Sequence, residues 1–228
     1  MKVIIVAGGN YEEDLVKSLI NETEEDVFII GADRGALSLI LSGIKIDLAI
    51  GDFDSVTEEE RETINTYSRE VVGLNPLKDA TDLEWAIDNA LFKCRIKRGY
   101  YNTIYLFAAT GTRLDHTFAN INLLYKVLKE NDDYMKIKAY IIDGHNRIRL
   151  LDERKRHVFY KDQLFGKYVS FLPFMGKVDK VTLKGFKYET DEAEFTEGNS
   201  LGISNEAKED MLSVYFESGK LLMFESRD

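Results

Sequence analysis

The sequence predicts a two-part protein, in which an α/β domain with a largely parallel, Rossmann-like sheet flanked by helices precedes an all-β sandwich domain. In the first part, short continuous apolar runs alternate with helical patterns, which is typical of a parallel sheet covered on both faces. After about residue 136, short β-type runs follow one another and are joined by turn residues. We place the boundary near 143–145, so the expected domains are residues 1–143 and 144–228.

The strands and helices of the first part alternate in a regular order. Strands are expected at the apolar runs 2–9, 26–33, 47–52, 69–74 and 103–110. Helices are expected at 12–20, 34–43 and 57–67, near 81 and near 114. The helix near 81 has the clearest pattern, with one face formed by Leu83, Ala86, Ile87, Ala90, Leu91 and Cys94. The helix near 114 is expected to bury the stripe Leu114, Phe118, Ile121, Tyr125 and Leu128.

Short β-type runs fill the second part of the chain. They lie at 136–143, 146–151, 156–160, 168–174, 180–186 and 213–226. The last run is interrupted by Glu-Ser-Gly-Lys at 217–220, which is expected to close a β-hairpin. No amphipathic helix pattern accompanies these runs, so they favour a sandwich or a barrel, and we predict the sandwich.

Composition limits the class of function. The 228 residues carry 30 basic and 40 acidic side chains, a net charge of −10, so no broad nucleic-acid surface is expected. The single cysteine, Cys94, excludes an intramolecular disulfide and fits a reducing compartment. The apolar run 3–7 is too short for a signal sequence or a membrane span, and no later run reaches that length. We therefore expect a cytoplasmic protein without membrane contact.

Two aspartates follow the third expected strand, in LAIGDFDSV at 48–56. Alternate residues of an extended chain share one face, so Asp52 and Asp54 should lie roughly 6–7 Å apart on the same side. Two carboxylates at that separation repel each other by roughly 2–3 kcal/mol at an effective dielectric constant near 20. This repulsion favours a positive group between the two side chains.

Further aspartates stand at other strand exits and helix starts: Asp33, Asp79, Asp82 and Asp115. The carboxyl ends of parallel strands meet at one edge of the sheet and form its ligand crevice. Taken singly, Asp33, Asp82 and Asp115 could each serve only to start a helix, and Thr81 with Glu84 could form a capping box. Taken together with Asp52 and Asp54, they favour a magnesium site, since Mg²⁺ binds carboxylates, waters and phosphate oxygens.

Three basic residues lie within two positions of these aspartates: Arg34, Lys78 and Arg113. Carboxylates with neighbouring cations suit a metal–phosphate substrate better than a bare metal ion. The alternative is local salt bridging on a wet surface, which contributes little. Neither GxxxxGK[ST] nor GxGxxG is present, so the two familiar nucleotide-binding motifs do not account for phosphate binding.

Six blocks, in order, resemble the thiamine pyrophosphokinase family. They are ADRGALSLILSGIKIDLAIGDFDSV (32–56), KDATDLEWAI (78–87), ATGTRLDHTFANINLL (109–124), GKYVSFLPF (166–174), VTLKGFKYE (181–189) and SLGISNEA (200–207). The resemblance implies transfer of pyrophosphate from ATP to thiamine, Mg²⁺ as cofactor, and a homodimer whose active site both protomers share. It implies an ATP-binding catalytic first domain and a second domain for thiamine binding and dimerisation.

The resemblance also implies roles for single residues. Asp52, Asp54, Asp82 and Asp115 are the expected catalytic residues, and the first three of them the expected metal ligands. Asp33, Arg34, Lys78, Asp79, Thr81 and Arg113 are expected at the ATP phosphates. Ser204 and Asn205 are expected to bind thiamine. The sequence does not decide whether Asp82 or Asp115 accepts the proton of the thiamine hydroxyl.

Two rival functions remain at this stage. The motif DFDSV matches the D-x-D-x-[TV] opening of haloacid-dehalogenase-type phosphatases, but it begins at residue 52, beyond the first strand. A phosphatase would form a phosphoaspartate on Asp52 and release inorganic phosphate, whereas a pyrophosphokinase would release AMP. A sensor would bind thiamine or nucleotide without turnover.

Overall fold

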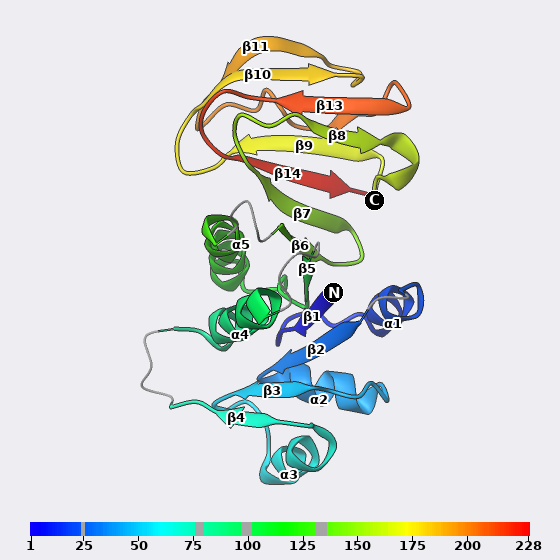
Figure 1. Cartoon of the computed structure of the whole chain (residues 1–228), viewed down its shortest axis with the longest axis vertical. Coiled ribbons are helices and arrows are strands. Elements are labelled where there is room, and N and C mark those ends of the chain that lie inside the picture. The colour runs from blue at the N-terminus through cyan, green and yellow to red at the C-terminus, as the bar shows by residue number, and fades with distance from the viewer. Residues whose placement is uncertain (24–25, 76–79, 97–101, 131–135) are drawn as a thin grey trace. The chain divides into compact units, whose positions relative to one another are not determined.

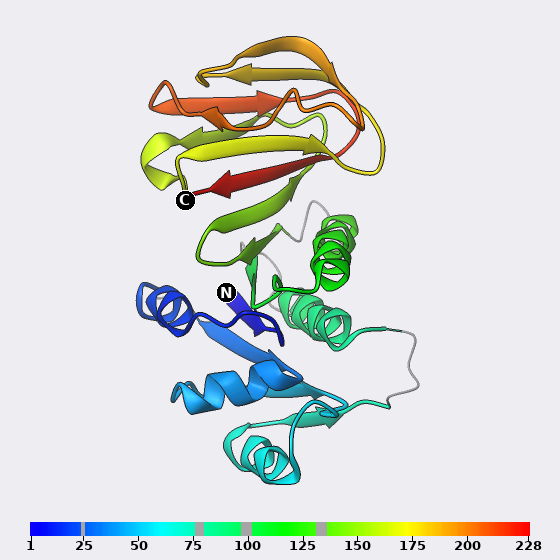
Figure 2. The same ribbon diagram turned by 180° about the vertical axis from the view of Figure 1, so that it is seen from behind.

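The computed structural model describes residues 1–23, 26–75, 80–96, 102–130 and 136–228, and it divides the chain into two units. The first unit is Met1–Gly144 and the second is His145–Asp228. Figure 1 shows the course of the chain, and Figure 2 shows it from behind. Each unit has its own sheet structure and is described by itself.

A parallel sheet forms the centre of the first unit. Its strands are β1 (Lys2–Val6), β2 (Val27–Ala32), β3 (Leu48–Gly51), β4 (Val71–Gly73), β5 (Asn102–Phe107) and β6 (Ile137–Ile142). They follow the order β6-β5-β1-β2-β3-β4, and every neighbouring pair is parallel. Side chains of β1 from Val3 to Val6 are fully buried, as expected for a strand covered on both faces. The predicted parallel α/β sheet is confirmed.

Five helices of the described residues accompany this sheet. They are α1 (Glu13–Asn21), α2 (Arg34–Leu41), α3 (Glu58–Tyr67), α4 (Asp82–Ile96) and α5 (Leu114–Lys129). Helices α1 and α2 lie on one side of the sheet, and α4 and α5 lie on the other (Figures 1 and 2). The predicted apolar face of α4 is buried along its whole length. The helix starts with Glu84 N donating to Thr81 Oγ1 at 3.2 Å, the backbone half of the predicted capping box.

The predicted buried stripe of α5 is wrong. Leu114 and Phe118 are both 66% exposed, whereas Leu124 and Val127 are the buried side chains of the helix. The helix carries apolar residues around much of its circumference, so a period of 3.6 residues does not select one face. Packing against the sheet decides which face of α5 is buried. The first turn of the helix lies at the edge of the sheet, so its apolar side chains stay exposed.

The sequence pattern groups strand β6 with the β-type runs of the second part, and that grouping is wrong. Its sequence shares the pattern of the β-type runs in the second part, yet the strand pairs in parallel with β5 from Asn102↔Ile137 to Phe107↔Ile142. Helix α5 lies between these two strands in sequence and provides the crossover that parallel pairing needs. Strand β6 therefore belongs to the first unit.

The second unit consists of two antiparallel sheets. One has the order β12-β9-β14-β7, and the other has the order β11-β10-β13-β8. The strands are β7 (Asn146–Leu151), β8 (His157–Tyr160), β9 (Tyr168–Pro173), β10 (Val178–Lys184), β11 (Thr190–Phe195), β12 (Asn205–Glu206), β13 (Met211–Tyr215) and β14 (Leu221–Ser226), with a short 3₁₀ helix at Lys161–Gln163. Residues from both sheets, such as Phe171 of β9 and Val181 of β10, share one apolar core. The predicted second β domain is confirmed as antiparallel.

The expected hairpin at 217–220 is wrong. Strand β13 pairs with β8 and β10, whereas β14 pairs with β7 and β9. The segment therefore carries the chain from one sheet to the other, and Gly219 supplies a left-handed conformation there, with φ +96°. Turn residues between two β runs do not reveal whether those runs pair with each other, because a sandwich offers two sheets.

None of the helices among the described residues has the length and apolar character to cross a bilayer.

Candidate active site

A cavity of about 600 Å³ opens at the carboxyl edge of the parallel sheet. Its walls are the segments that follow β1, β2 and β5 and the first turns of α4 and α5. Strands β1 and β5 are neighbours, and the chain leaves them towards opposite ends of the sheet. In open α/β sheets, ligands bind in the crevice at such a switch point.

The segments after β1 and β5 lie in close backbone contact at the base of this cavity. Gly9 N donates to Ala108 O at 2.8 Å, and Asn10 N donates to Thr110 O at 3.1 Å. A Cβ atom at Gly9 would collide with the carbonyl oxygens of Ala108 and Thr110. Ala108 itself has φ +51°, a conformation that costs a non-glycine residue energy. The strained backbone of Ala108 therefore lies at the cavity. Strained conformations of this kind cluster at functional sites.

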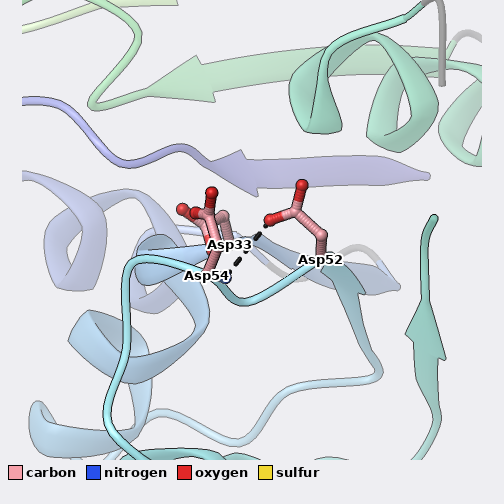
Figure 3. Close-up of side chains that lie close together, drawn as sticks. All are labelled: Asp33, Asp52 and Asp54. Atoms are coloured by element: carbon pink, nitrogen blue, oxygen red, sulfur yellow. Dashed lines mark hydrogen bonds between the residues drawn. The ribbon is translucent and has the colours of Figure 1, made fainter. Parts of the chain in front are cut away.

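Asp33, Asp52 and Asp54 form an acidic group beside the cavity. One carboxylate oxygen of each lies within 4.8 Å of the other two, and Figure 3 shows the three side chains. The chain after β3 is not extended as expected, because Phe53 is buried in a left-handed conformation with φ +56°. The resulting turn lets Asp54 N donate to Asp52 Oδ1 at 3.2 Å. The turn therefore brings the two carboxylates closer than an extended strand would.

Asp33 joins the acidic group from the end of β2, whereas Asp52 and Asp54 follow β3. Its backbone N donates to Ile50 O at 2.8 Å, and its φ is +48°. Its Oδ2 accepts a hydrogen bond from Ser55 Oγ at 2.7 Å, whereas Oδ1 is buried without a hydrogen-bond partner among the described residues. Asp33 is the N-cap of α2, but its side chain makes no capping bond. Burial raises its pKa above the usual range, and the charges of Asp82 and Asp52 act in the same direction.

Thr81 and Asp82 also line the cavity, at the start of α4. Asp82 does not belong to the acidic group within 4.8 Å, but it lies near enough to raise the pKa of Asp33. Two other expected phosphate-binding residues, Lys78 and Asp79, lie outside the described residues.

Arg113 and Asp115, at the start of α5, also line the cavity and pair with each other. Arg113 Nη2 donates to Asp115 Oδ2 at 2.5 Å, and Nε donates to Oδ1 at 3.2 Å. Both side chains are exposed, and the hydrogen bond from Arg113 lowers the pKa of Asp115. Arg34 is placed differently from Arg113. Its Nη1 donates to Ser55 O at 3.0 Å, so it holds the loop that carries Asp52 and Asp54.

Sequence reasoning missed several polar residues of this region, among them Asn120 and Ser55. Asn120 lines the cavity, and its Nδ2 donates to Ala109 O at 2.7 Å, which anchors the strained segment after β5. Apart from its place in the block 109–124, no sequence signal singles it out. Ser55 was also overlooked, although it directly follows Asp54.

Ser204 and Asn205 belong to the second unit. Ser204 has φ +55°, and its backbone N donates to Ser170 Oγ at 2.9 Å. Asn205 is only 3% exposed. Its Oδ1 accepts from Tyr188 N at 2.9 Å, and its Nδ2 donates to Tyr188 O at 2.7 Å. Asn205 thus fixes the backbone of Tyr188, whose side chain is 59% exposed.

Comparison with known protein families identifies both halves of the chain. The family described as thiamin pyrophosphokinase, catalytic domain, matches residues 19–137. The family described as thiamin pyrophosphokinase, vitamin B1 binding domain, matches residues 156–221. The chain belongs to the thiamine pyrophosphokinase family. The resemblance seen in the six sequence blocks is therefore confirmed, and the assignment carries thiamine diphosphokinase activity.

Members of the family resemble this chain along its whole length. The thiamine pyrophosphokinase of Bacillus subtilis (strain 168) is 38% identical over 229 residues, covering 100% of both chains. A crystal structure of the Bacillus subtilis protein superimposes with a TM-score of 0.85 at 37% identity, again over 100% of both chains. A family protein from Enterococcus faecalis superimposes with a TM-score of 0.80 at 26% identity over 100% of both chains. The family assignment displaces the phosphatase alternative for DFDSV.

Proposed function

We propose that this enzyme transfers pyrophosphate from ATP to the hydroxyl group of thiamine, with Mg²⁺ as cofactor, and releases thiamine diphosphate and AMP. One observation supports both the proposed cofactor and the location of its binding site. Three carboxylates lie together, one of them, Asp33, lining the cavity at the switch point of the sheet, and a buried oxygen of Asp33 is left without a hydrogen-bond partner among the described residues. Such an oxygen is costly to bury unless a ligand satisfies it.

The donor set fits Mg²⁺. Asp33, Asp52 and Asp54 offer hard oxygen ligands on two neighbouring strand exits, and Asp82 faces the same cavity. Mg²⁺ commonly binds a few carboxylates and completes its shell with waters and phosphate oxygens. When bound, the ion would neutralise phosphate charge and orient the triphosphate. We propose Asp33, Asp52 and Asp54 as its ligands, together with Asp82.

The cavity suits the triphosphate of ATP. The N-termini of α4 and α5 both contribute to its walls, and helix N-termini favour anions. Arg113 adds a guanidinium group at the same wall. We propose Arg113, Thr81, Lys78 and Asp79 as the residues around the phosphates. Transfer of this kind depends on positioning and charge neutralisation.

Thiamine binding is proposed for the surface around Ser204 and Tyr188. Asn205 holds the backbone of Tyr188 through two hydrogen bonds, which presents an exposed aromatic ring for packing on a heterocycle. The thiazolium of thiamine is cationic, so an acidic cavity also attracts it. We propose Asp82 or Asp115 as the proton acceptor, since both line the cavity; Asp115 pairs with Arg113 in this structure and would be released if the triphosphate engages Arg113.

We further propose a cytoplasmic homodimer in which both protomers share each site. The lone cysteine, Cys94, is a buried free thiol, consistent with a reducing compartment. Two variants test the sharing, Asp54→Asn in one chain and Ser204→Ala in the other, each assayed at a thiamine concentration so low that neither variant alone is active. If protomers share sites, the mixed variants regain activity, because one site of each mixed dimer is intact. Persistent inactivity of a mixture proven to exchange subunits would contradict a shared site.

The reaction is tested by incubating the protein with ATP, Mg²⁺ and thiamine and separating the products. Equal amounts of AMP and thiamine diphosphate are expected, and omission of Mg²⁺ should abolish both. Formation of inorganic phosphate without AMP would instead indicate a phosphatase. Tight thiamine binding without any product would indicate a sensor.

A further inference from the structure

Ser55 contacts the start of α2 through two different atoms. Its Oγ donates to Asp33 Oδ2 at 2.7 Å, and its carbonyl oxygen accepts from Arg34 Nη1 at 3.0 Å. Asp33 and Arg34 are consecutive residues at the start of α2. The loop that follows β3 is therefore fastened to the start of α2 by both the side chain and the backbone of one serine.

This double contact determines which oxygen of Asp33 is available. A carboxylate has two oxygens, and rotation about the terminal side-chain bond exchanges them. The Ser55 hydroxyl occupies Oδ2, so Oδ1 is the buried oxygen without a partner among the described residues. Without the hydroxyl, the Asp33 side chain would lose the side-chain hydrogen bond that fixes this orientation, and repulsion from Asp52 would favour its withdrawal.

The loop itself also needs to be held. Three carboxylates lie within reach of one another, and their mutual repulsion acts to open the loop before a cation binds. Burial of Phe53 anchors the loop on one side of Asp54, and the contacts of Ser55 anchor it on the other. Preorganised ligands of this kind bind metal more tightly, because less ordering remains to be done on binding.

We propose that Ser55 is a positioning residue of the cation site: its hydroxyl orients Asp33, and its carbonyl, held by Arg34, keeps the Asp52–Asp54 turn closed. This inference rests on the proposed function, because it concerns the same divalent-cation site. In this proposal Arg34 holds the loop after β3 and does not bind the ATP phosphates. Ser55 touches neither substrate nor reacting atoms and acts through Asp33.

The test measures Mn²⁺ binding to the full chain without nucleotide or thiamine, by the fraction of free Mn²⁺ in electron paramagnetic resonance. Ser55→Ala should weaken Mn²⁺ binding about 10-fold, the lower end of the range for residues that orient metal ligands. Ser55→Thr keeps the hydroxyl and should restore most of the affinity. A matched control is Ser218→Ala, which removes a similar bond, from Ser218 Oγ to Asp179 Oδ2 at 2.9 Å, in the second unit.

The outcomes separate this inference from the proposed function. Equal Mn²⁺ affinity of wild type and Ser55→Ala would overturn the positioning role, and so would a threonine variant that binds no better than the alanine variant. Thiamine diphosphate formation by the wild type, measured separately, decides the proposed function whichever result is obtained. In steady state, the alanine variant should require more Mg²⁺ for half-maximal rate and approach the wild-type rate at saturating Mg²⁺.

Discussion

Arg113 Nη2 lies 2.5 Å from Asp115 Oδ2, so two residues expected to act on the substrate neutralise each other in this structure. Both side chains are exposed at the cavity wall. A phosphate group offers the guanidinium the same paired geometry that a carboxylate does. Bound triphosphate would therefore compete with Asp115 for Arg113, and the pair would open when ATP enters.

Replacement of Arg113 tests this exchange. Arg113→Ala should lower kcat/KM for ATP by about 10²-fold, on the scale of losing one preorganised electrostatic group. Arg113→Lys should recover only part of the loss, because lysine keeps the charge without the planar fork. Steady-state kinetics with varied ATP give both values. An alanine variant with wild-type kcat/KM would remove Arg113 from the phosphate site.

Asp54 is the member of the acidic group that can be changed with least structural cost, because its side chain is exposed. Asp54→Asn should reduce turnover at least about 10²-fold while the fold stays intact. Product assays and circular dichroism give the two readouts. The exposed Asp14 of α1 offers a control, and Asp14→Asn should leave turnover unchanged. Normal turnover by the Asp54 variant would exclude this carboxylate from the mechanism.

Ser204, Asn205 and Tyr188 should affect thiamine far more than ATP. Ser204→Ala and Tyr188→Ala are expected to raise KM for thiamine with little change in KM for ATP, while Tyr188→Phe should behave like the wild type. Asn205→Ala should also destabilise the second unit, because it leaves the Tyr188 backbone without its buried partner. Similar changes in KM for both substrates would contradict a thiamine site at these residues.

His157 should make the stability of the second unit depend on pH. Burial lowers its pKa, and its Nε2 lies 2.7 Å from Asp152 O, to which it donates as a neutral ring. The unfolded chain binds the proton more tightly, so the stabilisation is present above the ordinary pKa of 6.5 and is lost as the pH falls through the lower pKa of the folded protein. Melting temperatures of wild type should therefore fall below pH 6.5, and those of His157→Gln should fall less.

The exposed His145 provides the comparison for that experiment. His145→Gln should keep the wild-type dependence of melting temperature on pH. If His157→Gln and wild type lost stability in parallel below pH 6.5, the burial of His157 would not be the cause.

The gathering of aspartates could be predicted from sequence because topology alone requires it. Asp33 follows β2 and Asp52 follows β3, and neighbouring parallel strands end at the same edge. The geometry within the group could not be predicted. It depends on the left-handed turn at Phe53 and on the burial of that ring, both of which tertiary packing imposes on a residue that would otherwise avoid this conformation.

The errors share a physical origin. Leu114 and Phe118 follow a helical period, but α5 has more apolar residues than one face can bury, so packing against the sheet decides which of them remain exposed. The segment 217–220 has the composition of a hairpin turn, but its flanking strands find partners in different sheets. Local pattern determines the type of an element, whereas long-range pairing determines its neighbours.

The central claim is that Asp33, Asp52 and Asp54 together hold the divalent ion that binds the triphosphate. A crystal of the protein with Mn²⁺ and an unreactive ATP analogue tests it most directly, through the anomalous scattering of manganese. The account predicts a peak bonded to carboxylate oxygens of these three residues and to phosphate oxygens of the analogue. A peak bonded to the phosphates but to none of the three aspartates would contradict it.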